Sequence, residues 1–399
     1  MISVEEAKEI INFNCGALPP IKMPLANANG YILAAAVFAP INSPPFNQSA
    51  MDGYAFNSAE TDWTKNVLVS GLSQTGDTNE TIFKKGSAIR IYTGAAVPNG
   101  ADTVIIQEHV ELHGNHIVLN HEAPKTGSNI RLAGSQIKID ECAAQAGTLL
   151  NAGTVGYLIG LGIEAVEVIP KPKIGIIVTG KELVKLGSNL MHGQVYESNS
   201  IMLKAALQDG NLVPELIAYA DDIEAEITAT IKKAIATCEV VLVTGGISVG
   251  DFDFVGKAFE NLGVEKLFYK VKQKPGKPLY AGKLGNTFLF GLPGNPSSVL
   301  SCYYEYVVPC LRKMRGYSFE ANNKQFLPLG ENTHKKGTLT NFLKGRIDNG
   351  FVFICEGQES YKLSAFTQAN CLVVLQAEQN ELKEGEIVEV HTLQNCWTN

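Results

Sequence analysis

The sequence lacks any excess of positive charge. It has 33 Lys and Arg residues against 40 Asp and Glu residues, a formal net charge of -7, and no long run of Lys or Arg. A nucleic-acid partner normally requires a basic face, so we predict that the protein binds no nucleic acid. If the substrate is an anion, the positive charge that holds it must be concentrated locally.

The sequence also lacks the signals of export, membrane insertion and structural metal binding. The N-terminus has no basic or apolar leader segment, and Ser3 and Glu6 form a capping-box pattern ahead of a helix instead. The most apolar stretch, residues 31–41, is too short to span a bilayer and contains Pro40. The 8 cysteines show no CxxC or CxxH spacing, and the 7 histidines show no ligand spacing. We therefore predict a cytoplasmic protein with unpaired cysteines and no membrane partner.

The sequence pattern changes several times along the chain, which predicts several domains. A chain of 399 residues exceeds what one hydrophobic core usually serves. Residues 1–45 are expected to be largely helical, short β-like runs follow from Ser49 to Asn120, and Pro170 with Pro172 marks a boundary. We predict an elongated N-terminal linker domain, an inserted small β domain, a central α/β domain and a C-terminal β barrel, at residues 1–45 with 130–170, 46–129, 171–317 and 318–399.

Strand and helix patterns alternate in the predicted α/β domain. Apolar runs rich in β-branched residues predict buried strands, and amphipathic segments predict helices. The expected strands lie at residues 173–179, 239–244, 266–271 and 287–290, and the expected helices at 199–207 and 222–236. A last helix is expected from Pro296 to Gly316, with a kink at Pro309. This alternation predicts a mostly parallel sheet in a three-layer domain.

Four loops are expected at the carboxyl ends of these strands, where open α/β sheets bind ligands. They are residues 179–183, 221–222, 245–253 and 291–298. The Gly-Gly pair of the third loop exposes backbone N–H groups to an anion, and Ser298 is expected near a helix N-terminus, which favours phosphate. Glu182, Asp221 and Asp253 are expected to converge on a hard cation such as Mg²⁺. Each feature alone has a plainer reading, a helix cap or a simple turn, but their common place at one sheet edge favours a site.

The local positive charge lies in residues 270–278, which read Lys-Val-Lys-Gln-Lys-Pro-Gly-Lys-Pro. Lysine binds an oxyanion as a compact point charge, and the rigid Pro-Gly-Lys-Pro ending can hold that charge in place. The alternative is a solvated Lys-rich edge strand, which sheets use against aggregation. The rigid ending favours the oxyanion site.

An unusual segment in the predicted small β domain reads Ser-Ala-Met-Asp-Gly-Tyr-Ala, at residues 49–55. Its aspartate, Asp52, follows a Pro-rich loop and is a candidate for an acid held at a special backbone position. On the residues alone, a simple Asp-Gly turn is the preferred interpretation.

Taken together, these segments resemble the MoeA family of molybdopterin molybdotransferases, which is related to the gephyrin E domain. The motifs occur in order along nearly the whole chain, at residues 49–55, 92–98, 129–131, 179–183, 244–251, 274–278 and 291–296. The resemblance implies a MogA-like molybdopterin-binding α/β domain, an elongated homodimer, and an active cleft between subunits. The implied reaction inserts molybdate into adenylated molybdopterin, with metal-dependent release of AMP.

The resemblance also implies roles for individual residues. Molybdate would lie near Lys274, Lys277, Pro278 and Ser360, and the cation near Asp221, Asp253 and Glu182. The expected catalytic residues are Asp52, Thr93, Glu182, Asp221 and Asp253. Those expected to hold the substrates are Gly245, Gly246, Ser248, Lys270, Lys274, Lys277, Pro278, Pro293, Pro296, Ser298, Lys344 and Ser360. A molybdopterin adenylyltransferase and molybdoenzyme apoproteins are possible partners.

This chemistry suits the residues available. Molybdate is a tetrahedral dianion that needs lysines and hydroxyls, and cleavage of the phosphoanhydride needs a metal to take up charge. Because the sulfurs of the pterin attack molybdenum, the protein contributes positioning and electrostatics and needs no covalent nucleophile.

The sequence departs from the family pattern at two positions. Gln136 stands where the family usually has an acid, and a neutral amide cannot serve as a ligand or base in the same way. Lys344 stands where relatives often have an arginine, so the charge is kept without the planar fork. We hypothesise weaker molybdate affinity, which a Lys344→Arg variant with the same molybdate titration would rule out.

Two other kinds of protein remain as alternatives. One is a different enzyme on the same α/β domain, either a molybdopterin adenylyltransferase or a CinA-like nucleotide pyrophosphatase. The other is a non-catalytic molybdopterin-binding or scaffold paralogue, which Gln136 keeps open.

Overall fold

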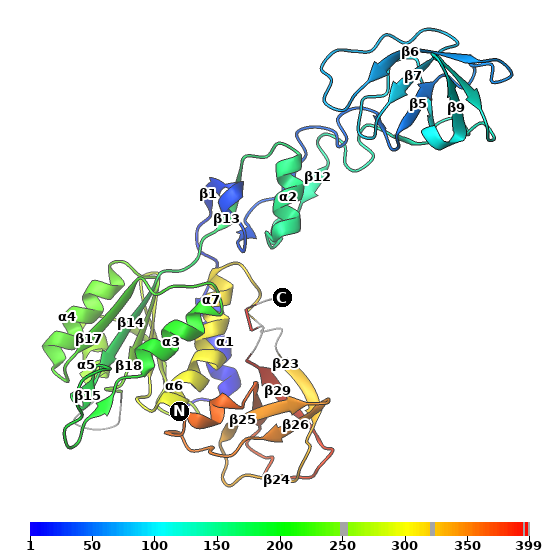
Figure 1. Ribbon diagram of the computed structural model, residues 1–399. Helices are drawn as coiled ribbons and strands as arrows, with labels where there is room; N and C mark the ends of the chain where they lie inside the picture. Colours follow the sequence, from blue (N-terminus) through cyan, green and yellow to red (C-terminus); the bar gives the residue numbers. More distant parts are fainter. Residues whose placement is uncertain (248–253, 320–323, 394–395, 398–399) are drawn as a thin grey trace. The chain divides into compact units, whose positions relative to one another are not determined.

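The computed structural model describes residues 1–247, 254–319, 324–393 and 396–397 (Figure 1). Internal contacts divide the chain into two compact units. The larger unit comprises residues 1–21 and 169–399, and the smaller unit comprises residues 22–168. The boundaries of the four domains expected from the sequence stay predictions.

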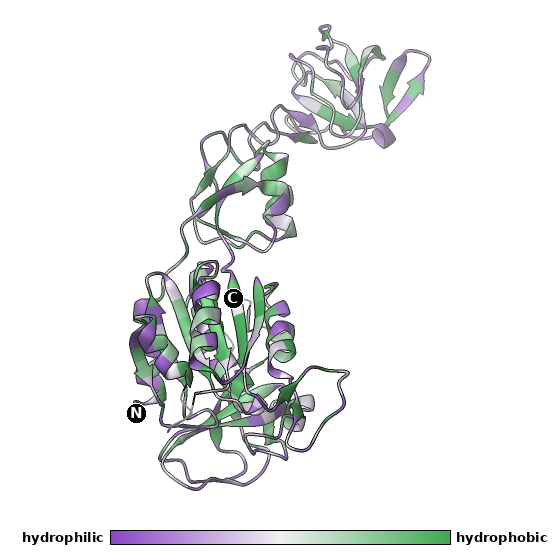
Figure 2. Ribbon diagram, turned by 90° about the vertical axis from the view of Figure 1, so that its left-hand side faces the viewer, coloured by the Kyte–Doolittle hydropathy of each residue, from purple (hydrophilic) through white to green (hydrophobic). Residues whose placement is uncertain are grey.

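The larger unit is built around a six-stranded sheet with the order β17-β14-β18-β22-β21-β19. Its strands are β14 (Ile174–Thr179), β17 (Leu216–Ala220), β18 (Val240–Thr244), β19 (Glu265–Tyr269), β21 (Tyr280–Leu284) and β22 (Thr287–Leu292). The strands β17, β14, β18 and β22 run parallel, whereas β21 pairs antiparallel with both β22 and β19. These central strands are largely apolar, as the green ribbons of Figure 2 show.

Helices cover both faces of this sheet (Figure 1). Ile176 and Leu242 face a core shared with α1 (Val4–Asn14), α3 (Asn199–Gln208) and the helical segment at residues 296–314. Their neighbours Ile177 and Val243 face the opposite core with α4 (Glu224–Ile235) and α5 (Phe254–Asn261). Because successive strand residues point to opposite faces, continuous apolar runs are what a sheet buried on both sides requires. The predicted three-layer α/β arrangement is confirmed.

The last helix of this region is interrupted by a π-helical turn. It consists of α6 (Pro296–Cys302), the π-helix η3 (Tyr303–Val307) and α7 (Val308–Met314). This changed hydrogen-bond pattern lies just before Pro309, and the kink expected there stays a prediction. Proline cannot donate the backbone hydrogen bond to residue 305 that an α-helix needs there.

A second sheet in the larger unit has the order β20-β25-β27-β29-β23, and β26 pairs with β25. Its strands are β20 (Gln273–Lys274), β23 (Lys324–Pro328), β25 (Thr340–Asp348), β26 (Phe351–Ile354), β27 (Cys371–Leu375) and β29 (Ile387–Thr392). A small ladder joins β24 (Thr333–His334) to β28 (Glu381–Leu382), and the 3₁₀ helix η4 spans Ser364–Thr367. The short strand β20 lies between β19 and β21 in the chain but pairs with β25. This pairing joins the lysine-rich segment to the C-terminal sheet.

The N-terminal residues are less helical than the sequence predicts. Only α1 is α-helical in residues 1–45, and its capping box is present, with the Glu6 N–H donating to Ser3 Oγ at 3.0 Å. The chain then forms short strands, so the helical prediction for residues 15–45 is wrong. Pro19, Pro20 and Pro24 explain this, because proline lacks an N–H and disfavours helical backbone at the preceding residue.

The smaller unit is mainly β-structure. Its largest sheet has the order β8-β5-β7-β6-β10-β9, made of β5 (Gly53–Phe56), β6 (Val67–Ser73), β7 (Ala88–Ile91), β8 (Thr103–Ile106), β9 (Val110–His113) and β10 (His116–Leu119). Three smaller ladders contain β1 (Ile21–Pro24), β2 (Ile32–Leu33), β3 (Val37–Phe38), β4 (Gln48–Ser49), β11 (Ile130–Arg131), β12 (Cys142–Ala144) and β13 (Ala165–Ile169). The helical elements are η1 (Leu25–Asn27), η2 (Gln107–His109) and α2 (Ala152–Gly160). In neither unit is any helix of the described residues long and apolar enough to cross a membrane.

Candidate active site

A pocket of about 540 Å³ lies at the carboxyl ends of the parallel strands, and we call it the sheet-edge pocket. Thr179 ends β14, Gly245 follows β18, and Pro293 follows β22. Its lining residues are Thr179, Gly180, Glu182, Leu183, Val195, Tyr196, Glu197, Ser198, Asn199, Asp222, Gly245, Gly246, Ile247, Pro278, Pro293, Gly294, Asn295 and Pro296. Three of the four loops expected at this edge therefore meet with their predicted residues in one pocket. The fourth contributes Asp222.

The Gly-Gly loop is packed tightly against the end of β14. Gly245 has φ +84°, and a Cβ on it would overlap the Thr179 carbonyl oxygen. A side chain here would therefore displace the loop, so glycine is required by both backbone conformation and space.

The carboxylates of the sheet-edge pocket differ from the predicted set by one position. Glu182 and Asp222 line the pocket, whereas Asp221 does not. The Asp222 carboxylate accepts a hydrogen bond from the Lys181 N–H at 3.2 Å, and the Asp221 N–H donates to Glu226 Oε1 at 3.1 Å. Of the two adjacent aspartates, only Asp222 therefore joins Glu182 in lining this pocket.

The described residues contain no cluster of three or more His, Cys, Asp or Glu side chains suited to a metal ion. Mg²⁺, however, typically keeps several waters and takes only one or two protein carboxylates together with substrate phosphates. Glu182 and Asp222 fit that requirement, because both carboxylates lie in the pocket.

The lysine loop, residues 274–277, carries the local positive charge that the sequence predicts for the site. Lys274 and Lys277 are exposed, whereas Pro275 and Gly276 between them are buried. Pro278, directly after the loop, lines the sheet-edge pocket. Like Lys274 and Lys277, Lys270 does not line the pocket, and its ammonium group lies 4.9 Å from the centre of the Tyr269 ring.

Two further predicted residues approach the start of α6 from the C-terminal sheet region. Lys344 is fully buried on β25, and its Nζ donates to Ser297 Oγ at 3.2 Å. Burial lowers the pKa of Lys344 to about 8. Ser360 Oγ accepts a hydrogen bond from Asn295 Nδ2 at 3.0 Å, and Asn295 lines the sheet-edge pocket.

Several pocket residues were not predicted from the sequence. Asn199 is buried at the start of α3, and its Nδ2 donates to the Gly294 carbonyl at 3.0 Å. Glu197 caps the same helix by accepting hydrogen bonds from the N–H and hydroxyl of Ser200, at 2.7 and 2.6 Å. The sequence predicts Asn199 only as the first residue of the amphipathic helix at 199–207, and it predicts no role for Glu197. The polar residues just before the apolar positions of this helix are the signal that could have suggested a site.

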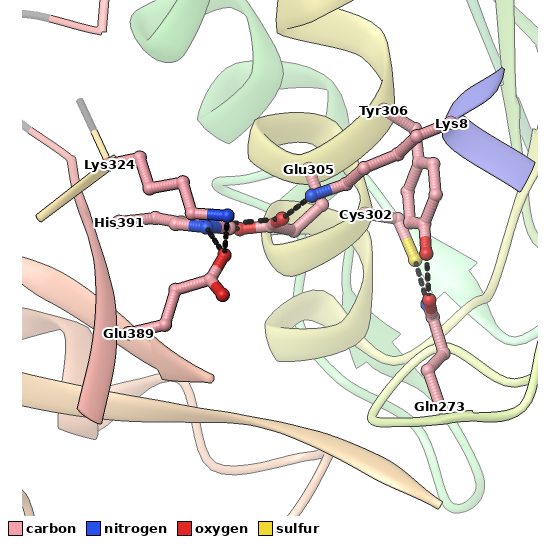
Figure 3. Close-up of polar contacts among 8 residues, drawn as sticks. All are labelled: Lys8, Gln273, Cys302, Glu305, Tyr306, Lys324, Glu389 and His391. Atoms are coloured by element: carbon pink, nitrogen blue, oxygen red, sulfur yellow. Dashed lines mark hydrogen bonds and ion pairs between the residues drawn. The ribbon is translucent and has the colours of Figure 1, made fainter. Parts of the chain in front are cut away.

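Another pocket, of about 710 Å³, lies elsewhere, and we call it the paired-charge pocket. It lies among α1, η3 and the strands β23 and β29, and it contains none of the predicted site residues. Its charged side chains bind one another, as Figure 3 shows for Lys8, Glu305, His391, Glu389 and Lys324.

Comparison with known proteins shows which family has this architecture. Residues 2–162 match the model of the MoeA N-terminal region (domain I and II), residues 175–313 match a probable molybdopterin binding domain, and residues 327–393 match the MoeA C-terminal region (domain IV). The chain is 34% identical to a protein from Haemophilus influenzae named molybdopterin molybdenumtransferase, over 92% of each chain. The chain belongs to the MoeA family. A Staphylococcus epidermidis protein of the same name is 31% identical over 98% of this chain and 95% of its own.

The structural comparison agrees with the MoeA assignment. The crystal structure of a molybdopterin biosynthesis MoeA protein from Pyrococcus horikoshii has a TM-score of 0.84 and 28% identity, and it covers 98% of this chain and 99% of its own. The fold class and the resemblance stated from the sequence are both confirmed.

The MoeA resemblance also implies catalytic roles for Asp52 and Thr93. These two residues lie together in the smaller unit. Asp52 Oδ1 accepts hydrogen bonds from the Thr93 hydroxyl at 2.7 Å and from the Thr93 N–H at 2.8 Å. These hydrogen bonds, together with the charge of Arg90, lower the pKa of Asp52. The carboxylate is therefore ionised near neutral pH. Gln136, in the same unit, accepts a hydrogen bond from Ser43 Oγ at 2.8 Å.

Two residues predicted from the MoeA motifs, Ser248 and Asp253, lie outside the described residues. Ser298, by contrast, is described and is buried in the first turn of α6, where its N–H donates to the Asn295 carbonyl at 2.9 Å.

Proposed function

We propose that this protein inserts molybdenum, supplied as molybdate, into adenylated molybdopterin and releases AMP. The observation that carries the proposal is a pocket lined by Glu182, Asp222 and Pro278, with the exposed Lys274 and Lys277 just before Pro278 in the chain. An anionic metal oxide needs the cations, and a phosphoanhydride that loses AMP needs oxygen ligands for a divalent ion. The names of the relatives, molybdopterin molybdenumtransferase, support the same reaction.

In this proposal each group acts by binding and orientation. The ammonium groups of Lys274 and Lys277 hold molybdate, with the Ser360 hydroxyl and the Lys344 ammonium as further donors. The narrow Gly-Gly turn at 245–246 lets the substrate approach the backbone closely. No covalent intermediate on the protein is required, since the pterin itself supplies the sulfur nucleophiles.

We propose Mg²⁺ as the divalent ion. Glu182 and Asp222 would hold it together with water and substrate phosphates, where it would offset the negative charge of the leaving phosphate. The predicted ligand Asp253 would join this set. Asp221 lies beside Asp222 in the chain and does not line the pocket, so Asp222 replaces it in the proposal.

The experiment combines purified protein, adenylated molybdopterin, molybdate and Mg²⁺, and it follows AMP release together with activation of a molybdenum-free apoenzyme. We expect AMP release that depends on both molybdate and Mg²⁺. A parallel reaction with molybdopterin and ATP tests the adenylyltransferase alternative, and consumption of ATP there would contradict the proposal. Tight binding of the adenylated pterin without turnover would identify a carrier or scaffold protein.

We also propose a cytoplasmic homodimer in which the cleft is shared between subunits, as the family resemblance implies. Subunit complementation tests both points. A mixture of Asp52→Ala and Lys274→Ala chains should recover activity if Asp52 and Lys274 serve one site from different subunits. Light scattering checks that the mixture is dimeric. If a dimeric mixture does not recover activity, both residues of a site belong to one chain.

A further inference from the structure

The lysine loop is buried at its centre and exposed at its two lysines. Gly276 is buried with φ +82°, and a Cβ on it would overlap Cys302 Sγ. On either side of this buried centre, Lys274 belongs to β20, and the Lys277 carbonyl accepts a hydrogen bond from the Val271 N–H at 3.0 Å. The two lysines therefore project from a segment whose middle is inserted into the protein.

Gln273 holds the buried centre of the loop. Its side chain is 1% exposed, and its Nε2 donates to the Gly276 carbonyl at 3.2 Å and to Cys302 Sγ at 3.5 Å. Its Oε1 accepts a hydrogen bond from the Tyr306 hydroxyl, as Figure 3 shows. A buried amide without partners is costly, so this arrangement strongly restricts where Gln273, and with it Gly276, can lie.

Tyr306 is fitted to this role by its surroundings. It lies in the π-helix η3 and is completely buried in the apolar core of the larger unit. Burial raises the pKa of Tyr306 well above its usual value, so the hydroxyl stays protonated and donates. A π turn changes the angular spacing of side chains, and such turns are frequent at functional sites.

A second tyrosine of η3 provides an internal comparison. The Tyr303 hydroxyl is buried and has no hydrogen-bond partner among the described residues. The tyrosines share the same turn and the same burial, but only the Tyr306 hydroxyl is connected to the lysine loop.

We propose that Tyr306, acting through Gln273, is a positioning residue that sets the place of Lys274 and Lys277 for binding molybdate. The inference rests on the proposed function in one respect, that the lysine loop holds molybdate. Lysine side chains are long and flexible, and a fixed loop reduces the freedom that they must lose when they bind the oxyanion. Neither Tyr306 nor Gln273 contacts substrate in this proposal.

The test compares Tyr306→Phe with Tyr303→Phe in the full-length protein. Calorimetry measures the Kd for molybdate, turnover measures KM for molybdate and for adenylated molybdopterin, and thermal unfolding measures stability. For Tyr306→Phe we expect the Kd and KM for molybdate to rise about tenfold, with KM for the adenylated pterin unchanged. Tyr303→Phe should leave all three constants unchanged. A loss of stability in Tyr306→Phe with no change in the Kd for molybdate would show a merely structural role and overturn the inference.

Gln273→Met supplies a second variant of similar volume that removes all three hydrogen bonds of the amide. We expect it to weaken molybdate binding as much as Tyr306→Phe, and the double variant to be no weaker than either, since the residues act in series. Additive effects would overturn the connection between them. Wild-type protein that binds molybdate without turnover would contradict the proposed function and leave the Kd comparison valid. Turnover with equal molybdate KM in Tyr306→Phe and Tyr303→Phe would overturn the inference alone.

Discussion

Two pockets of the larger unit, the paired-charge pocket and the sheet-edge pocket, differ in whether their charged side chains are paired. In the paired-charge pocket, Glu305 binds Lys8 at 2.6 Å and His391 at 2.8 Å, so each charge is neutralised by the protein itself. In the sheet-edge pocket, neither Glu182 nor Asp222 forms an ion pair within the described residues. Charges that are already paired stabilise a fold, whereas unpaired charges in a pocket are available to a ligand. We therefore assign a structural role to the paired-charge pocket, and the sheet-edge pocket remains the proposed site.

Two buried lysines near the C-terminal sheet, Lys335 and Lys344, also differ in how fully the protein satisfies their charge. Lys335 Nζ donates to the carbonyls of Gly337, Leu339 and Ala377, at 3.2, 3.1 and 3.0 Å. Lys344 Nζ has one hydrogen-bond partner in the described part of the chain, the Ser297 hydroxyl. An ammonium group can donate three hydrogen bonds, so Lys335 is satisfied by the fold and Lys344 retains donors for an anion.

The strongest test of the contrast removes the charges of the lysine loop. We expect Lys274→Ala with Lys277→Ala to lower kcat/KM for molybdate by about 10²–10³-fold, the range for loss of a donor to a reacting oxyanion. Thermal unfolding should be unchanged, because both side chains are exposed. Lys272→Ala is the matched control, since Lys272 is exposed in the same segment but lines a different pocket with Met1. A large loss of stability in the double variant would show that Lys274 and Lys277 stabilise the fold, as the side chains of the paired-charge pocket do.

The next largest effect should come from the paired charges. Burial by itself would raise the pKa of Glu305, but His391 and Lys8 outweigh it and lower the value to about 2. Breaking a buried pair from one side leaves an uncompensated charge, so Glu305→Gln should lower the free energy of unfolding by about 3 kcal/mol. Urea denaturation measures this change, and AMP release should fall little at temperatures where the variant is folded. Glu9→Gln is the control, because Glu9 lines the same pocket but is exposed. Equal effects of the two substitutions would contradict the assigned pairing.

The pH dependence of molybdate binding should distinguish the two buried lysines. With its pKa lowered to about 8, Lys344 loses its charge as pH rises from 7 to 9. We expect KM for molybdate to rise about tenfold over that range, because a neutral amine no longer attracts the dianion. Lys344→Arg should bind molybdate more tightly and lose the pH dependence, and Lys335→Arg should keep it. If KM for molybdate of the wild-type protein does not change with pH, Lys344 does not contribute to molybdate binding.

Much of the larger unit is predictable because its signals are local. The strands β14 and β18 are continuous apolar runs buried on both faces, and both were predicted within one residue of their observed bounds. The strands β17 and β21 were missed. β17 is only partly buried, and β21 contains Gly282 and Lys283, so neither shows a continuous apolar run.

The site was predictable to the level of loops but not of individual contacts. The motif at a strand end indicates the sheet edge, but it cannot tell whether Asp221 or Asp222 faces the pocket. The contact between Gln273 and Tyr306 joins residues 33 positions apart, and no periodicity of either segment indicates it. Such pairings depend on tertiary packing, here on a π turn that a helix pattern in the sequence does not reveal.

The smallest expected effect is the pH dependence of the stability that the paired-charge pocket provides. Burial lowers the pKa of His391, but Glu305 and Glu389 outweigh burial and raise it above its ordinary value. A raised folded-state pKa means that this stabilisation is complete below the ordinary histidine value of about 6.5 and is lost as pH rises through the folded value. Glu305 and Glu389 have depressed values of about 2, so their stabilisation is present above about 4.5 and is lost as pH falls toward 2. The network therefore contributes most between about pH 4.5 and 6.5.

The variant His391→Gln tests this window, because it keeps a polar side chain and removes the charge. We expect it to lower the free energy of unfolding by about 1–2 kcal/mol at pH 5.5 and by less at pH 9, because this stabilisation is lost as pH rises through the raised pKa of His391. Urea denaturation at both values measures the difference, and the affinity for molybdate should be unchanged at each pH. A destabilisation that grows with pH would mean that His391 is neutral in the folded protein, and a changed molybdate affinity would mean that the paired charges also serve the site.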